Sequence, residues 1–182
     1  VLAVVGGVIG GIWVAAANMM ENYKVNKTVE GVFSTARNIQ NLISIRDSEA
    51  LGNGVLITST IISAKAISSN WINDNSIVNP FGGNVTIKNM LDAYPARVRI
   101  GLYSIPTSSC ITIVVKISEM GASANGGQGA GTLNRIGLGF LSINTTVNYS
   151  TSDFPISLDT ATTKCNQKTN DIFLDFGYTR TN

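Results

Sequence analysis

The feature that most constrains this chain is its opening stretch, VLAVVGGVIGGIWVAAANMM, which contains no charged side chain. A helix of about 20 apolar residues is long enough to cross a bilayer, so we favour a membrane helix retained in the mature protein. One alternative is a signal peptide cut near Ala15–Ala17, although the basic segment that usually begins such peptides is absent. The other is a buried core helix, in which each of the four glycines would cost roughly 1 kcal/mol.

A second helical pattern begins directly after this stretch. Apolar residues recur there at spacings of three and four, which places them on one face of a helix: Val25, Val29, Val32, Ala36, Ile39 and Ile43. No proline interrupts residues 1–46, so we expect a single helix about 70 Å long. That is too long for the interior of a 19.2 kDa protein. Its first half must therefore be buried in a bilayer or against other copies of the chain.

Composition narrows the function classes. The 182 residues suffice for one compact domain plus an extension. Charged residues make up only 13%, which is typical of a secreted surface protein, and the net charge of +2 is too small to predict a dedicated nucleic-acid site. With no histidine and two cysteines, the chain has almost nothing from which to build a zinc site or a Ser-His or Cys-His nucleophile. We therefore expect no enzymatic activity, catalytic residue, metal or cofactor.

The two cysteines, Cys110 and Cys165, predict one disulfide if the chain is secreted. Two buried free thiols are the alternative. The glycine-rich segment 121–131 lacks the lysine that a phosphate-binding P-loop requires, so we expect a mobile surface loop there.

The rest of the chain predicts a sheet. After a helix stop at Gly52–Gly54, residues 55–72 indicate a shorter helix or a packed loop, and Asn79–Asn84 is dense in turn residues. Segments rich in β-branched or alternating apolar residues predict strands at 85–87, 96–103, 111–117, 138–143, 146–149 and 171–176. A helix followed by strands favours an α+β fold, in which an antiparallel sheet packs on the C-terminal half of the long helix.

Three local motifs, in this order along the chain, resemble type IV pilins, and specifically the type IVb group of enteric pathogens and conjugative plasmids. The segment from Ile67 to Gly83 resembles the end of the loop between helix and sheet, where an Asn-Pro-Phe-Gly-like turn recurs. Ser108–Ile113 resembles the segment that bears the first family cysteine. Lys164–Gly177 resembles the second cysteine followed by the last strand.

The resemblance implies a structural subunit with two parts: a hydrophobic helix at 1–24, and a globular pilin domain at 25–182. Such subunits wait in the bacterial inner membrane, are trimmed by a prepilin peptidase, and are polymerised by an assembly machine into an extracellular pilus. The implied partners are therefore other copies of the chain, this machinery, the inner membrane and a host or recipient cell surface. A minor pilin, a type II secretion pseudopilin and a secreted monomeric binding domain remain alternatives.

The same resemblance implies assembly residues in the opening helix. Gly6 and Gly10, like Gly7 and Gly11, are four residues apart and would let a neighbouring helix approach closely. Plain enrichment of glycine in membrane helices is the alternative. The other residues expected to pack in the assembly are Val1, Leu2, Val4, Val8, Ile9, Ile12 and Trp13. Mature type IV pilins usually carry a glutamate at their fifth position; because Val5 stands here, we expect a few residues to precede Val1.

Overall fold

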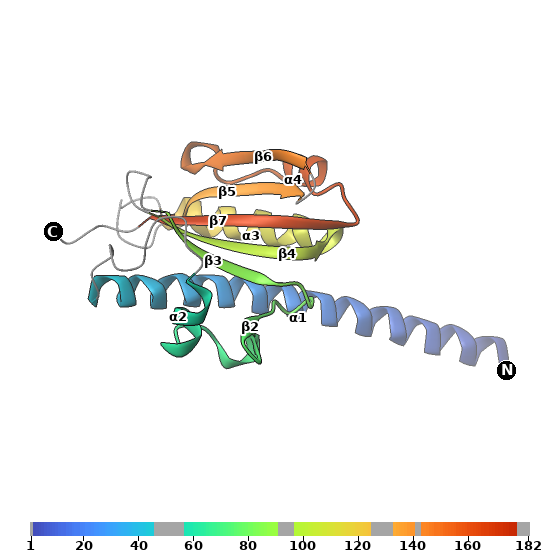
Figure 1. The fold of residues 1–182 in the computed structure, drawn as a ribbon. Helices are drawn as coiled ribbons and strands as arrows, with labels where there is room; N and C mark the ends of the chain where they lie inside the picture. The colour runs from blue at the N-terminus through green and yellow to red at the C-terminus, as the bar shows by residue number, and fades with distance from the viewer. Residues whose placement is uncertain (1, 46–56, 91–96, 125–132, 141–142, 178–182) are drawn as a thin grey trace.

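A computed structural model describes residues 2–45, 57–90, 97–124, 133–140 and 143–177 (Figure 1). Within the first helix it describes the side chains of residues 13–42. The elements, in chain order, are α1 (Leu2–Ile45), α2 (Thr58–Ser63), η2 (Ser69–Trp71), β1 (Ile72–Asn73), β2 (Ser76–Ile77), β3 (Val85–Met90), β4 (Arg97–Pro106), α3 (Thr107–Ala124), β5 (Leu133–Phe140), β6 (Ile143–Ser150), η3 (Thr151–Asp153), α4 (Leu158–Lys164) and β7 (Thr169–Gly177).

The centre of the fold is a five-stranded antiparallel sheet in the order β3-β4-β7-β5-β6. Because side chains alternate between the faces of a strand, the register places apolar residues of neighbouring strands side by side. One such row crosses four strands and is fully buried: Ile87, Ile100, Leu174 and Ile136. The predicted α+β fold with an antiparallel sheet is confirmed.

Helices cover this apolar face of the sheet. In Figure 1, α3 lies behind the sheet, and α1 runs below it and extends well beyond it toward the N-terminus. The C-terminal half of α1 joins the same core, where the rings of Phe33 and Phe176 meet edge to face with centroids 5.8 Å apart. The sheet therefore packs on the second half of the long helix, as the sequence predicts.

The turn at Asn79–Asn84 connects the helical side of the molecule to the sheet. The Asn79 side chain accepts hydrogen bonds from the backbone N–H groups of Phe81 and Gly83, at 2.8 and 3.3 Å, and donates one to the carbonyl of Tyr103 at 2.8 Å. A side chain at Gly83 would place its Cβ only 1.8 Å from that same carbonyl oxygen. Gly83 is thus required by the close approach of this turn to β4.

The strand prediction for residues 111–117 is wrong, because this segment lies inside the helix α3. Its β-branched residues favour a strand when each is taken alone, but the propensity is weak and packing overrides it. The buried positions show the period of a helix, with spacings of three, one and three: Cys110, Ile113, Val114 and Ile117. This stripe packs α3 against the sheet and α1.

Other predicted boundaries shift. Residues 121–124, predicted as part of a surface loop, form the last turn of α3, and residues 125–131 lie outside the described part of the chain. The predicted strand 138–143 covers the end of β5 and the start of β6. In 55–72, α2 is only six residues long. The predicted helix stop at Gly52–Gly54 lies outside the described residues.

Candidate assembly site

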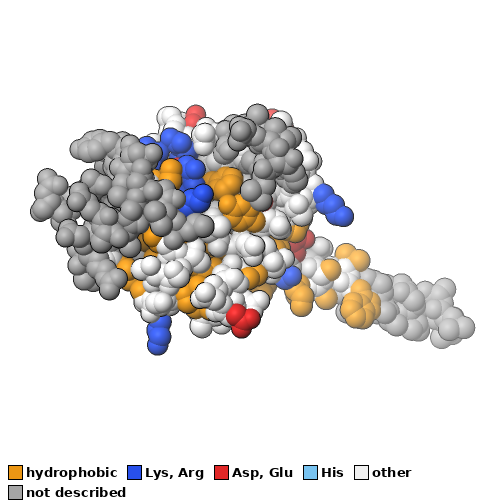
Figure 2. Space-filling view, viewed as in Figure 1, with side chains coloured by type: hydrophobic (Ala, Val, Ile, Leu, Met, Phe, Trp, Pro, Cys, Tyr) orange, Lys and Arg blue, Asp and Glu red, His pale blue; other side chains and the backbone are white. Residues whose placement is uncertain are grey.

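The first described part of α1 is an exposed apolar rod. Residues 13–20 all lie at the surface, and the exposed fractions of Trp13 and Met19 are both 73%. Figure 2 shows hydrophobic side chains along this projecting part of the helix. A helix that is apolar around its whole circumference is normally buried in a core or a membrane. Within the described part of the chain, no other element covers this segment.

Among the helices that the structure describes, none is both long and apolar enough to cross a membrane. Most of the apolar stretch predicted as a membrane helix, residues 1–12, lies outside the described side chains, although the backbone of α1 is helical from Leu2 onward.

Burial begins at Val25, one helical turn after the apolar stretch ends. The predicted stripe is confirmed at Val25, Val29, Val32, Ala36 and Ile39, whose exposed fractions are at most 6%. The side chain of the sixth predicted member, Ile43, lies outside the described residues. The second half of α1 is therefore a core helix of the domain.

Glu21 marks the junction between the two halves. Its carboxylate Oε1 accepts hydrogen bonds from the hydroxyl groups of Ser108 and Ser109, at 2.5 and 2.7 Å, in the first turn of α3. These bonds, above all that from Ser108, lower the pKa of Glu21 below its ordinary value of 4.5, and partial burial opposes them. The negative charge also lies at the positive end of α3. We call this contact the Glu21 clasp; it fixes the point where α1 leaves the domain.

A second attachment lies further along α1, at Gly31. The Cβ of any larger residue there would lie 2.3 Å from Cζ2 of Trp71, so the indole ring packs directly on the helix backbone. Trp71 is itself buried, with an exposed fraction of 4%. Near the end of α1, Asn38 Nδ2 donates to the carbonyl of Ala66 at 3.1 Å and Gln40 Nε2 to that of Gly177 at 3.2 Å. Contacts to α3, to the α2–β1 segment and to β7 therefore hold the second half of α1.

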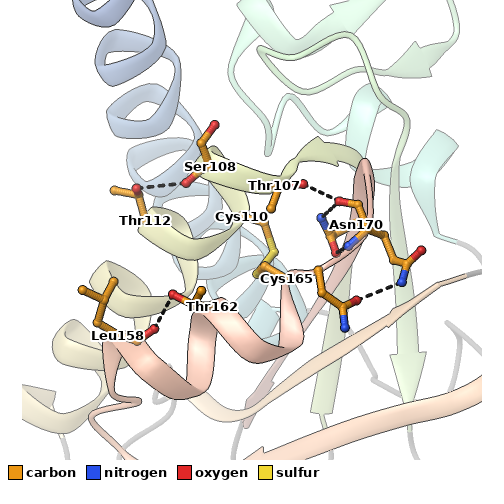
Figure 3. Close-up of a disulfide and its surroundings, with 10 residues drawn as sticks. Thr107, Ser108, Cys110, Thr112, Leu158, Thr162, Cys165 and Asn170 are labelled. Carbon is orange, nitrogen blue, oxygen red and sulfur yellow. Dashed lines mark hydrogen bonds between the residues drawn. A yellow bond between two sulfur atoms is a disulfide. The ribbon is translucent and has the colours of Figure 1, made fainter.

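The two cysteines form a disulfide between Cys110 in α3 and Cys165 at the C-terminal end of α4 (Figure 3). Both are fully buried. The bond joins residues 55 positions apart, which is worth about 4 kcal/mol in the chain-entropy account. It ties α4 to the same end of α3 that holds the Glu21 clasp, so α1 leaves the domain beside a covalently fixed anchor.

Comparisons with known proteins bear on this architecture. No protein-family model matches the chain, and no curated protein matches it. A solved structure does match: a type IVb pilin from Salmonella typhi, with a TM-score of 0.60 and 18% sequence identity, over 85% of this chain and 99% of that one. The chain has the type IVb pilin fold. The expectation drawn from the sequence motifs is confirmed at the level of the fold.

Within this pilin fold, the structure describes the predicted assembly residues to different extents. Trp13 lies on the exposed rod. The side chains of Leu2, Val4, Val8, Ile9 and Ile12 lie outside the described residues, as does the whole of Val1. Gly6, Gly7, Gly10 and Gly11 are helical in the backbone of α1. The roles of all these residues in assembly remain predictions.

The sequence analysis missed the residues that attach α1 to the pilin domain. Glu21 is the first charged residue after the apolar stretch, and Thr107–Ser109 is a run of hydroxyl residues typical of a helix start. Those two signals would have pointed to the Glu21 clasp if residues 107–124 had been predicted as a helix. No comparable sequence signal pairs Gly31 with Trp71.

Proposed function

We propose that this chain is a structural subunit that polymerises through its N-terminal helix into a type IVb pilus. The observation that carries the proposal is the division of α1: one continuous helix is a core element from Val25 and an exposed apolar rod before it. A soluble monomer would leave this rod in water. A filament of identical subunits buries it against the rods of other copies.

The apolar residues Val1–Met20 serve in two environments on this proposal. Before assembly they anchor the subunit in the inner membrane, and after assembly they form the filament core. Burial of apolar area, at roughly 25 cal/mol per Å², opposes return of the helix to water in both states. Gly6, Gly7, Gly10 and Gly11 reduce side-chain bulk where helices approach. The onset of burial at Val25 supports a division into an anchor at 1–24 and a pilin domain at 25–182.

The proposal implies further partners and a location. A prepilin peptidase trims the precursor, an assembly machine extracts the subunit from the inner membrane, and the product is an extracellular pilus. The filament serves adhesion, aggregation or mating-pair contact, and its surface meets a host or recipient cell. The disulfide supports passage through an oxidising compartment, because such bonds persist in secreted proteins.

The test is electron microscopy of material sheared from the native cell, labelled with antibody against the globular domain. Label along the whole length of filaments supports a major pilin. Label only at filament tips indicates a minor pilin. Protein that stays in the membrane fraction without filaments indicates a pseudopilin, and a soluble monomer whose N-terminus lies near Asn18 indicates a cleaved signal peptide.

A further inference from the structure

The face of the sheet that points away from α3 carries a row of cationic side chains. The strand register pairs Lys88 with Arg99, Arg99 with Asp175, and Asp175 with Arg135. Directly paired residues project from the same face, so these four side chains cross β3, β4, β7 and β5 in one line. Figure 2 views the molecule from this side and shows Lys and Arg side chains gathered over the sheet. We call this line the basic row.

Positive charge exceeds negative charge in the basic row. Asp175 is its acidic member: the side chain is 3% exposed and accepts hydrogen bonds from Nε and Nη2 of Arg99 at 2.7 and 2.9 Å. Arg135 Nε lies 4.0 Å from the other carboxylate oxygen, and its side chain is 35% exposed. Arg97, two residues before Arg99 on the same face of β4, has a buried Nε without a hydrogen-bond partner among the described residues. Among the described residues, Asp175 forms salt bridges with Arg99 and Arg135. A second buried carboxylate on this face, Asp171, accepts a hydrogen bond from the backbone N–H of Ser104. Four described cationic residues therefore face two described acidic ones.

Aromatic and hydroxyl groups lie at the other end of the same face. Phe173 lies two residues before Asp175 on β7. Its ring packs edge to face against the ring of Tyr103, with the ring centroids 5.8 Å apart. The absence of a side chain at Gly101 leaves room for the Phe173 ring, since a Cβ there would lie 3.3 Å from it. Thr86 Oγ1 donates to the Tyr103 hydroxyl at 3.3 Å. Both rings are half-buried and present part of their surface to solvent.

We propose that this face binds a polysaccharide that carries carboxylate groups. Cationic side chains bind carboxylates through charge-assisted hydrogen bonds, and the partly exposed Arg135 and Lys88 are the groups that would make them here. The half-buried rings of Tyr103 and Phe173 offer apolar surface to the C–H faces of sugar rings, and the hydroxyl groups offer hydrogen-bond partners to sugar hydroxyls.

Two other anionic partners fit the face less well. Duplex DNA carries one charge per about 1.7 Å and is bound by broad positive fields, whereas the basic row holds Asp175 at its centre and the whole chain carries only +2. Binding to an anionic lipid surface is strengthened by apolar side chains that insert between headgroups. Here the rings of Tyr103 and Phe173 are half-buried in the sheet face. A sugar chain with carboxylate groups offers charges to the basic row and C–H and hydroxyl groups to the end with Tyr103, Phe173 and Thr86.

The test measures binding of the full chain, in detergent, to immobilised polygalacturonate at about 0.15 M salt, where long-range charge effects are screened. Lys88→Gln/Arg135→Gln should weaken binding by about tenfold to a hundredfold, because each charge-assisted contact is worth roughly tenfold. The matched control is Lys164→Gln/Lys168→Gln, which removes the same charge from two exposed lysines outside the sheet face. We expect the control to bind within about twofold of the unaltered chain.

Competition distinguishes the sources of negative charge. Soluble polygalacturonate should displace the chain at least tenfold more effectively than duplex DNA or phosphatidylglycerol vesicles at equal charge concentration. The proposal is overturned if duplex DNA or the vesicles compete as well as polygalacturonate. It is also overturned if the two double variants lose the same amount of binding. If the Arg135 change lowers the unfolding midpoint, Lys88→Gln alone decides, since Lys88 has no salt bridge among the described residues. Binding by the detergent-solubilised subunit does not depend on filament formation, so this inference and the proposed function fail separately.

Discussion

The two halves of α1 have the same secondary structure and opposite surroundings. Between residues 13 and 20 every side chain is exposed, whereas from Val25 to Ile39 one face is buried against the domain. The helix continues through the junction without a break. Among the described residues, packing within the single chain thus explains the apolar pattern of the second half and leaves residues 13–20 exposed. On the proposed function, a membrane or another subunit covers the first half.

The largest expected effect is on assembly, from a charge in the exposed half. We predict that Val14→Asp abolishes filament formation, because a carboxylate must then be buried in a bilayer or between helices, at about 2.5–3.5 kcal/mol at the bilayer centre. Val14 is 63% exposed in the single subunit, so the domain should unfold at the same denaturant concentration. The measurement is the ratio of sheared to cell-associated protein on immunoblots.

A matched control places the same charge beyond the apolar stretch. Asn22 is exposed and lies next to Glu21, and Asn22→Asp should assemble at normal levels. The prediction fails if Val14→Asp cells carry normal filaments. Because the carboxylate could also block insertion, the amount of each variant in the membrane fraction is measured in parallel.

The second prediction compares truncations in the two halves. Ile39 is fully buried, and Ile39→Ala should lower the free energy of unfolding by about 2–5 kcal/mol through lost burial and a residual cavity. Met19 is 73% exposed, and Met19→Ala should change it by less than about 0.5 kcal/mol. Guanidinium unfolding of the full chain in detergent measures both. Similar losses in the two variants would mean that the exposed half contributes to the fold of the single subunit.

The sequence predicted α1 well because its two signals, the spacing of apolar residues and the absence of proline, are both local. Apolar residues at spacings of three and four, without a proline, specify a helix whatever it packs against. The strand prediction for residues 111–117 was wrong because Ile, Thr and Val favour strands locally. Their burial in α3 depends instead on packing against the sheet and α1. The helical spacing of Cys110, Ile113, Val114 and Ile117 was present in the sequence, but it competed with a continuous β-branched run.

The attachments of α1 were harder to predict because they join distant segments. Glu21 and Ser108 are separated by 87 residues, and no local pattern links them. Gly31 suggests a close approach of some kind, but only the fold shows that Trp71 fills the space. The cysteine pair was predictable because the chain contains only two cysteines and hence one intramolecular pairing.

The third prediction concerns Gly31, in the buried half. In an exposed helix, Gly→Ala stabilises by up to about 1 kcal/mol. At Gly31 the new Cβ would lie 2.3 Å from the Trp71 ring, and overpacking typically costs about 1–3 kcal/mol. We therefore expect Gly31→Ala to destabilise by about 1 kcal/mol net. Ser34→Ala, at an exposed position of the same helix, is the control and should be neutral or slightly stabilising. A stabilised Gly31→Ala would show that Trp71 can move away from α1.

The smallest effect concerns the Glu21 clasp, where the two halves meet. Its hydrogen bonds lower the pKa of the folded-state carboxyl, so Glu21 stabilises the folded protein above its unfolded pKa. That contribution is lost as the pH falls below about 4.5 and through the lower folded-state pKa. Glu21→Gln should therefore be less stable than the unaltered chain at neutral pH, and the difference should shrink as the pH falls below about 4.5. Urea unfolding of the full chain in detergent at several pH values measures it. A difference that stays constant with pH would mean that Ser108 and Ser109 bind the amide as well as the carboxylate, and that the charge of Glu21 does not hold α1 to α3.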